Sequence, residues 1–173
     1  MINASVRLYP ARVIFLLMTV GCMVLIFLFS SDNAVRSSSK SGRVTDTVVE
    51  IIVNDYDELS AEKQLSIRDK AEHIIRKLAH YSVYAMLGFC ASMAVGQRKL
   101  FGKGSLGVLI FCFLYACSDE IHQIFVPGRA GMFTDVLIDT GGALTGMLCS
   151  FVIFGIVKLI SNRKNEKKER ITA

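Results

Sequence analysis

The chain has 173 residues, of which 52% are hydrophobic, and its 20 Lys and Arg against 15 Asp and Glu give a formal net charge of +5. This length suits one domain, with room for a small appendage. The apolar residues gather in four blocks, and neither a strand–turn–helix alternation nor a Gly-rich phosphate loop occurs. These features argue against a soluble α/β enzyme and predict a small all-α, polytopic membrane protein.

The first apolar block covers Val13 to Phe29, about 17 residues without a charge. A helix of about this length just crosses the hydrocarbon core of a bilayer. A secretory signal peptide is the alternative, but its apolar region is usually about 7–15 residues long and ends at a small-residue cleavage site that is not evident here. We therefore expect an uncleaved membrane anchor.

The long connection that follows is predicted to be partly helical. The serine-rich segment Ser37–Gly42 is typical of a flexible linker, and Val44–Val53 is amphipathic and expected to lie on the membrane surface. Ser60 is a predicted N-cap for a helix that begins near Ala61 and continues into the second span.

The remaining apolar blocks cover about Leu78–Gly96, Leu106–Ser118 and Val136–Ile160. The third block is short, so it spans a bilayer only if its helix continues through the polar residues that follow, as far as Phe125. The Pro127-Gly128 pair then ends that helix. Together the blocks predict a four-helix transmembrane bundle.

The distribution of basic residues predicts the orientation of this bundle. Lys and Arg concentrate before the first span, between the second and third spans, and after the fourth, whereas the connection after the third span is mainly acidic. By the positive-inside rule, both termini are expected in the cytoplasm and the protein in the cell membrane. The expected segments are a cytoplasmic stub with the anchor (1–30), an extracytoplasmic linker with the amphipathic helix (31–71), a transmembrane core (72–160) and a basic cytoplasmic tail (161–173).

In this topology, the polar residues of the spans gather at the outer end. A charged group near mid-bilayer costs about 2.5–3.5 kcal/mol on insertion scales, so such groups are expected to pair or to face a ligand. One interpretation is structural, with Arg129 paired to Asp135 or Asp119 and His80 paired to Asp139. We favour a functional polar pocket, with the following expected members: Lys77, His80, Tyr84, Asp119, Glu120, His122, Gln123, Arg129, Asp135 and Asp139.

Small residues recur at helical spacing in two of the spans. Gly142, Ala143 and Gly146 share one face of the fourth span, and Gly88 with its neighbours Ala85 and Ser92 forms a similar face in the second. Such faces usually allow helix backbones to pack closely in a membrane, so we expect helix packing here rather than ligand contacts.

Several of these residues form a recognisable pattern. Arg76-Lys77-Leu78-Ala79-His80-Tyr81, the stretch from Asp119-Glu120-Ile121-His122-Gln123 to Pro127-Gly128-Arg129, and the later Asp135 and Asp139 occur in that order. Over about residues 72–148 the chain resembles the VanZ-like family. The resemblance implies a multi-helix membrane protein of mostly Gram-positive bacteria, whose namesake is associated with resistance to teicoplanin, and it transfers no catalytic residues.

The preferred hypothesis is an envelope protein whose outward pocket binds a lipid-linked or headgroup-bearing molecule and thereby contributes to glycopeptide resistance. One alternative is an intramembrane enzyme that modifies a cell-wall precursor or phospholipid, with His80 or His122 as general base. Another is a non-catalytic scaffold or partner subunit. Membrane lipids and a lipid-linked cell-wall precursor are the expected partners, nucleic acid is not, and self-association stays open.

No cofactor is predicted, although a divalent metal is a weaker alternative. The carboxylates of Asp119, Glu120, Asp135 and Asp139 are oxygen ligands of the kind that Mg²⁺ takes. Many VanZ-like relatives have an acid shortly before the motif tyrosine, where this chain has Val83. This departure weakens the metal hypothesis.

Overall fold

The computed structural model describes residues 4–31, 34–96, 102–129 and 131–172, and within them it contains helices and no strands. Its elements are α1 (Ala4–Ser31), α2 (Ala34–Ile52), the short 3-10 helix η1 (Tyr56–Glu58), α3 (Ala61–Val95), α4 (Lys103–Ile124) and α5 (Phe133–Thr172). Four of these helices, α1, α3, α4 and α5, are long and apolar enough to cross a membrane. The predicted all-α, four-span architecture is confirmed.

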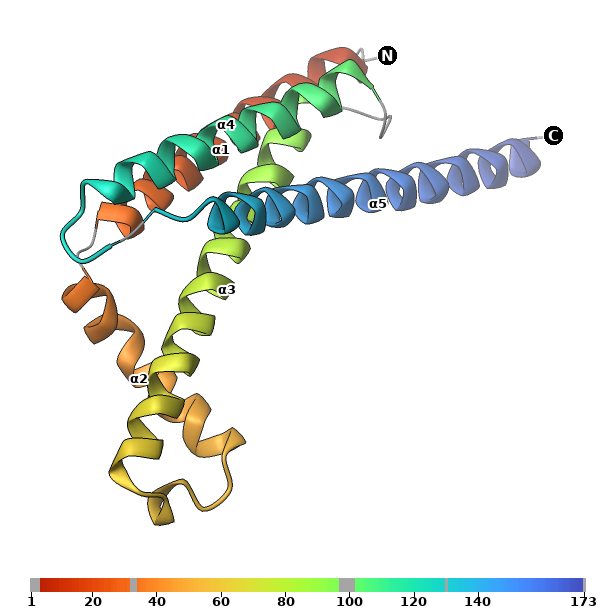
Figure 1. Ribbon diagram of the computed structural model, residues 1–173. Coiled ribbons are helices and arrows are strands. Elements are labelled where there is room, and N and C mark those ends of the chain that lie inside the picture. Colours follow the sequence, from red (N-terminus) through yellow and green to blue (C-terminus); the bar gives the residue numbers. More distant parts are fainter. Residues whose placement is uncertain (1–3, 32–33, 97–101, 130, 173) are drawn as a thin grey trace.

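The four long helices alternate in direction. At one end, Arg12 and Val13 of α1 border the same surface hollow as Ala94 and Val95 of α3. Figure 1 shows both chain termini at this end. At the opposite end α1 and α4 finish, the chain leads into α2, and α5 begins. We call this opposite end the α4–α5 end.

The α2 helix and the first half of α3 form a helical hairpin that extends beyond the four spans (Figure 1). At its tip the Gln64 amide donates hydrogen bonds to the carbonyls of Tyr56 and Leu59, at 3.0 and 3.1 Å. Ser60 takes the predicted N-cap position of α3, although its side chain makes no capping hydrogen bond. An α3 helix of 35 residues is about 52 Å long, more than a bilayer core requires, so its first half is free to form this hairpin.

The predicted flexible linker at Ser37–Gly42 is wrong, because this segment is part of α2. The α2 helix packs against α3, where Arg68 pairs with Asp46 at 3.0 Å. Val49, one turn from Asp46, is only 3% exposed. Serine and glycine have low intrinsic helix propensity, but packing against a neighbouring helix overrides it.

Close packing of α3 on α5 confirms the two predicted small-residue faces. A Cβ atom added to Gly88 would overlap the backbone of Ala143, one added to Gly142 would overlap the Tyr81 carbonyl, and one added to Gly146 would overlap that of Ala85. Farther along, the hydroxyls of Ser92 and Ser150 are 2.7 Å apart in a buried hydrogen bond. These glycines are therefore the reason that the two backbones can touch.

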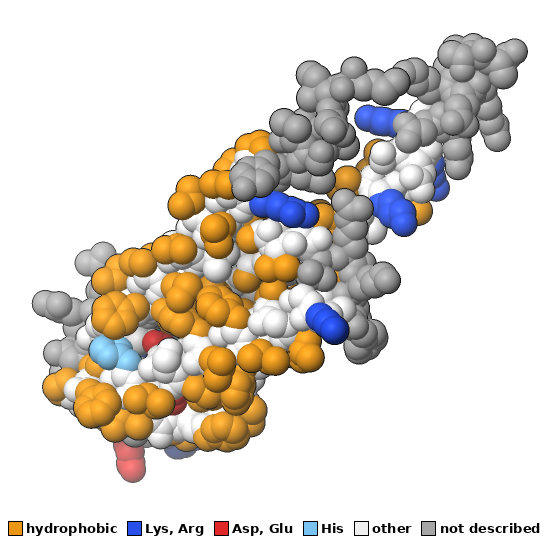
Figure 2. All heavy atoms as spheres, turned by 90° about the horizontal axis from the view of Figure 1, so that it is seen from above, with side chains coloured by type: hydrophobic (Ala, Val, Ile, Leu, Met, Phe, Trp, Pro, Cys, Tyr) orange, Lys and Arg blue, Asp and Glu red, His pale blue; other side chains and the backbone are white. Residues whose placement is uncertain are grey.

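The outer surfaces of the spans are apolar. Leu17 of α1, Leu114 of α4 and Val152 of α5 are each 60% or more exposed. In Figure 2 hydrophobic side chains cover much of one face, with acidic and histidine side chains toward one end and Lys and Arg toward the other. Unpaired apolar area on this scale is expected where lipid, rather than water, surrounds a helix bundle.

The close glycine contact predicts that one added methyl group at this position destabilises the fold. Gly146→Ala should lower the free energy of unfolding by about 1–3 kcal/mol, because the new Cβ meets the Ala85 carbonyl. Gly155→Ala is the matched control on the same helix, since its Cβ would meet nothing within 4 Å. Thermal unfolding of both variants in detergent tests this, and equal midpoints for the two would contradict it.

Candidate functional site

A pocket of about 190 Å³ opens at the α4–α5 end, between α3, α4 and the start of α5. Most of the residues that line it carry polar or charged side chains. It is lined by His73, Arg76, Lys77, His80, Glu120, Gln123, Gly128, Arg129, Met132, Asp135, Ile138 and Asp139.

The α3 wall of the pocket is basic. His73, Arg76, Lys77 and His80 occur at spacings of three and four, so they share one face of the helix. Lys77 Nζ lies 2.7 Å from Asp135 Oδ1, which ties α3 to the first turn of α5. Arg76 pairs with an acid on its own helix at 2.9 Å, and its buried Nε has no hydrogen-bond acceptor among the described residues.

Arg129 forms the opposite wall and is held by two helices. Its Nη1 donates to Gln123 Oε1 of α4 at 3.2 Å, and its Nη2 donates to the Phe29 carbonyl of α1 at 3.0 Å. The preceding Gly128 has φ +79°, a left-handed conformation that lets the chain turn sharply after α4. The structural interpretation paired Arg129 with Asp119 or Asp135. The contacts found are different: Asp119 accepts from Ser30 and Gln123, and Asp135 pairs with Lys77.

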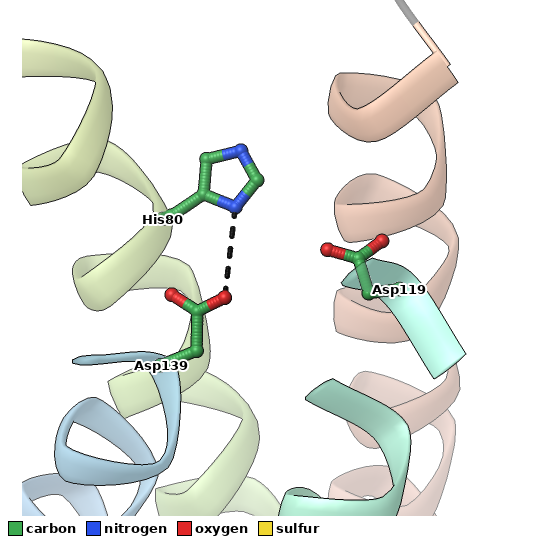
Figure 3. A group of neighbouring side chains, drawn as sticks. All are labelled: His80, Asp119 and Asp139. Carbon is green, nitrogen blue, oxygen red and sulfur yellow. Dashed lines mark ion pairs between the residues drawn. The ribbon is translucent and has the colours of Figure 1, made fainter. Parts of the chain in front are cut away.

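At the wall of the pocket, two buried carboxylates and a histidine come together from three helices (Figure 3). Asp119 of α4 is 5% exposed and Asp139 of α5 is 3% exposed. His80 Nδ1 lies 3.9 Å from Asp139 Oδ2, so the predicted pairing of these two residues is present. One donor atom from each of the three side chains lies within 4.8 Å of the others, an arrangement able to hold a metal ion.

Asp119 is fixed by neutral hydrogen-bond donors. Ser30 Oγ of α1 donates to Asp119 Oδ2 at 2.9 Å, and Gln123 Nε2 donates to the same oxygen at 3.2 Å. The Gln123 amide also reaches Ser30 Oγ at 3.4 Å. These contacts orient the carboxylate toward His80 and join α1 to α4 at the site.

Tyr84 lies one helical turn from His80, deeper in the bundle, and is fully buried. Its hydroxyl has no hydrogen-bond partner among the described residues. The adjacent Tyr115, whose ring centroid is 6.3 Å away, donates its hydroxyl to the Met23 carbonyl at 2.7 Å. The Tyr115 hydroxyl therefore has a hydrogen-bond partner, whereas the Tyr84 hydroxyl has none among the described residues.

Two predicted site residues have other contacts. His122 lies outside the pocket, where its Nε2 is 3.1 Å from Ser31 Oγ and its ring stacks on Phe27 at a centroid distance of 4.9 Å. Glu120 does line the pocket, but its Oε1 accepts the backbone N–H of Met132 and so holds the α4–α5 loop. The predicted Mg²⁺ ligand set of four acids is not formed as one cluster, because Asp135 and Glu120 have these separate partners.

Three residues with polar side chains at the site were not among the predicted pocket members. His73 and Arg76 share the basic face with Lys77 and His80, and the spacing of three and four would have found them. Ser30 comes from the end of the first span, outside the motif region, and no local signal marks its contact with Asp119 across the bundle.

The fold and this site define an all-α membrane protein with a polar pocket at one end of a four-helix bundle. Residues 15–155, more than half of the chain, match the family model described as VanZ/LLP1. The chain belongs to the VanZ/LLP1 family, which confirms the resemblance seen in the motifs. Comparisons with curated proteins and with solved structures give no significant match.

Removing the hydroxyl is expected to affect stability differently at the two buried tyrosines. Tyr115→Phe should lower the free energy of unfolding by about 1 kcal/mol, because it deletes the hydrogen bond to Met23. Tyr84→Phe should not lower it, because the hydroxyl it removes is unsatisfied in the folded state. Unfolding in detergent with EDTA present measures both, and a loss for Tyr84→Phe equal to that for Tyr115→Phe would contradict this.

Proposed function

We propose that this protein binds the phosphate-bearing headgroup of a membrane lipid or lipid-linked cell-wall precursor in the pocket at the α4–α5 end. Through this binding it contributes to glycopeptide resistance of the teicoplanin type. The single observation that carries the proposal is the convergence of Arg76, Lys77 and Arg129 on one pocket at the end of the spans. Family membership supports an envelope role.

The chemistry of the walls suits a phosphate group. Guanidinium groups offer several N–H donors in a planar fork that matches the oxygens of a phosphate, and lysine supplies a point charge. The two arginines face the pocket from different sides, since Arg76 lies on α3 and Arg129 follows α4. An anion between them would accept hydrogen bonds from both, including one from the unpartnered Arg76 Nε.

The position of the pocket suits a lipid. Exposed apolar residues adjoin the loop that forms its rim: Phe125 is 79% exposed and Phe133 is 66% exposed. Such side chains are stable beside the acyl chains of lipids. The pocket is at the ends of the spans, which is the level of the lipid headgroups. A ligand with a phosphate head and an apolar tail would therefore place its head in the pocket and its tail among the acyl chains beside the spans.

We infer that the pocket faces the outside of the cell. Both termini lie at the opposite end of the bundle, together with the basic residues Arg12, Lys103 and Lys164 of the long helices. The positive-inside rule assigns that end to the cytoplasm. An outward pocket would meet the lipid-linked precursors that glycopeptides bind at the cell surface.

Cysteine labelling tests the orientation. A membrane-impermeant maleimide added to intact cells should modify Asp57→Cys, at the tip of the α2–α3 hairpin, and should not modify Lys164→Cys on α5. The unsubstituted chain, which contains five native cysteines, gives the background level of labelling. Labelling of Lys164→Cys alone would place the pocket in the cytoplasm and overturn this part of the proposal.

Susceptibility to teicoplanin tests the function. At matched membrane levels the wild-type chain should raise the inhibitory concentration, and Arg129→Gln should reduce that protection by at least about tenfold, because it removes the charged wall of the pocket. Arg68→Gln is the matched control, since Arg68 pairs with Asp46 in the hairpin and does not line the pocket. Equal protection by all three chains would contradict the proposal.

An intramembrane enzyme is the second candidate, and one observation favours it. His80 and Asp139 line the same pocket as the basic residues, so an imidazole with a carboxylate beside it faces the proposed headgroup. Such a pair is able to serve as a general base. Lipid extracts of the same strains separate the candidates, because a lipid species that changes only with the intact chain indicates turnover and an unchanged profile indicates binding.

A further inference from the structure

We propose that His80, Asp119 and Asp139, together with the hydroxyl of Tyr84, form a binding site for one divalent metal ion at the wall of the pocket. The site goes beyond the proposed function, because binding of the ion itself requires no headgroup. Figure 3 shows the side chains of His80, Asp119 and Asp139 pointing toward a common space from α3, α4 and α5.

The distances suit ligands of one ion. Two ligands that lie about 2.0–2.2 Å from a metal are separated by about 3 to 4.4 Å, depending on the angle between them. His80 Nδ1 and Asp139 Oδ2 are 3.9 Å apart, too far for a hydrogen bond but within this interval. The third donor, from Asp119, lies within 4.8 Å of both, so small side-chain rotations would bring all three onto one ion.

The charges also suit a divalent ion. Asp119 and Asp139 are almost fully buried, and the hydrogen-bond donors to Asp119 are the neutral groups of Ser30 and Gln123. Two carboxylates in a membrane-embedded site are costly unless a positive charge accompanies them. One ion of charge +2 would neutralise both, whereas His80 supplies at most one positive charge.

Tyr84 gives a second and independent indication of a ligand. It lies one turn along α3 from His80, its side chain is fully buried, and its hydroxyl has no partner among the described residues. Buried polar groups are nearly always hydrogen-bonded to protein, water or a ligand. A metal ion, or a water molecule bound to it, would satisfy this hydroxyl.

The surrounding contacts hold the ligands in place. Both hydrogen bonds to Asp119 go to Oδ2, and no group of the described residues donates to Oδ1, which leaves that oxygen able to bind the ion. Ser30 and Gln123 thus have the orienting role that outer-shell hydrogen bonds have in metal sites. His80 and Asp139 are positioned by the glycine contact between α3 and α5.

The donor set indicates the kind of ion. Mg²⁺ and Ca²⁺ prefer oxygen ligands throughout, whereas an imidazole nitrogen is a common ligand of transition metals. One imidazole with two carboxylates and a nearby hydroxyl suits Mn²⁺ or Zn²⁺. These two ions are therefore the probes that we choose.

The ion would raise the affinity of the pocket for anions. This consequence rests on the proposed function. Among the lining residues, the three formal positive charges of Arg76, Lys77 and Arg129 are matched by the three negative charges of Glu120, Asp135 and Asp139. Asp119 of the same cluster adds a further negative charge. A bound divalent ion would make the whole site net positive and so favourable to a phosphate.

The test is Mn²⁺ binding to the full-length chain, purified in detergent and treated with EDTA, followed by electron paramagnetic resonance of the free ion. The wild-type chain should bind one equivalent of Mn²⁺, and Zn²⁺ should displace it. Asp139→Asn should weaken binding by at least about tenfold, and Tyr84→Phe by a smaller factor. Asp135→Asn is the matched control one turn away on α5, because Asp135 pairs with Lys77, and it should bind nearly as the wild type does.

Two results would overturn the metal site: no binding by the wild-type chain, or equal weakening by Asp139→Asn and Asp135→Asn. Thermal unfolding with and without Mn²⁺ provides a second measurement, since the ion should raise the midpoint of the wild-type chain and not that of Asp139→Asn. Arg129→Gln should bind Mn²⁺ normally even though it loses teicoplanin protection. Failure of metal binding and failure of the headgroup proposal are therefore seen in different variants and different assays.

Discussion

The close contact between α3 and α5 is the constraint on which the rest of the structure depends. Gly142 lies against the Tyr81 carbonyl and Gly146 against that of Ala85, so the helices meet backbone to backbone. Asp139 precedes the first of these contacts by three residues, and His80 directly precedes Tyr81. The 3.9 Å between His80 and Asp139 is therefore set by glycine packing, and larger residues at these positions would move the two ligands apart.

A second clamp joins α1 to the end of α4, and it uses polar groups rather than small ones. Ser30 donates to Asp119 and the Phe29 carbonyl accepts from Arg129. In a bilayer the hydrophobic effect does not draw helices together, so such hydrogen bonds contribute to helix association as well as to the site. The residues that orient the cluster thus also hold the bundle closed at this end, and assays of function need matched measurements of stability.

The sequence could predict features of single helices better than contacts between segments that are distant in the chain. Hydropathy and charge predicted the four spans, and helical spacing predicted the small-residue faces, because these are properties of single helices. The pairing of His80 with Asp139 followed from the predicted topology, which places both residues at the same end of the bundle. The helical state of Ser37–Gly42 depends on packing against α3, and the contact of Ser30 with Asp119 crosses 89 residues of chain. Neither leaves a local pattern. His122 lies outside the pocket because residues three apart on a helix, such as Asp119 and His122, face different neighbours when other helices enclose it on several sides.

The burial of two carboxylates is hard to explain by structure alone. A buried ion pair often contributes no more stability than apolar residues of the same size would, so such groups are weak evidence for a purely stabilising role. Here His80 lies at 3.9 Å from Asp139, beyond hydrogen-bonding distance, and the donors to Asp119 are neutral. The unsatisfied hydroxyl of Tyr84 lies one turn deeper. A cluster that is well oriented but incompletely satisfied is better explained as a site prepared for a cation. Arg76, Lys77 and Arg129 of the adjoining pocket would then bind the anion that the cation attracts.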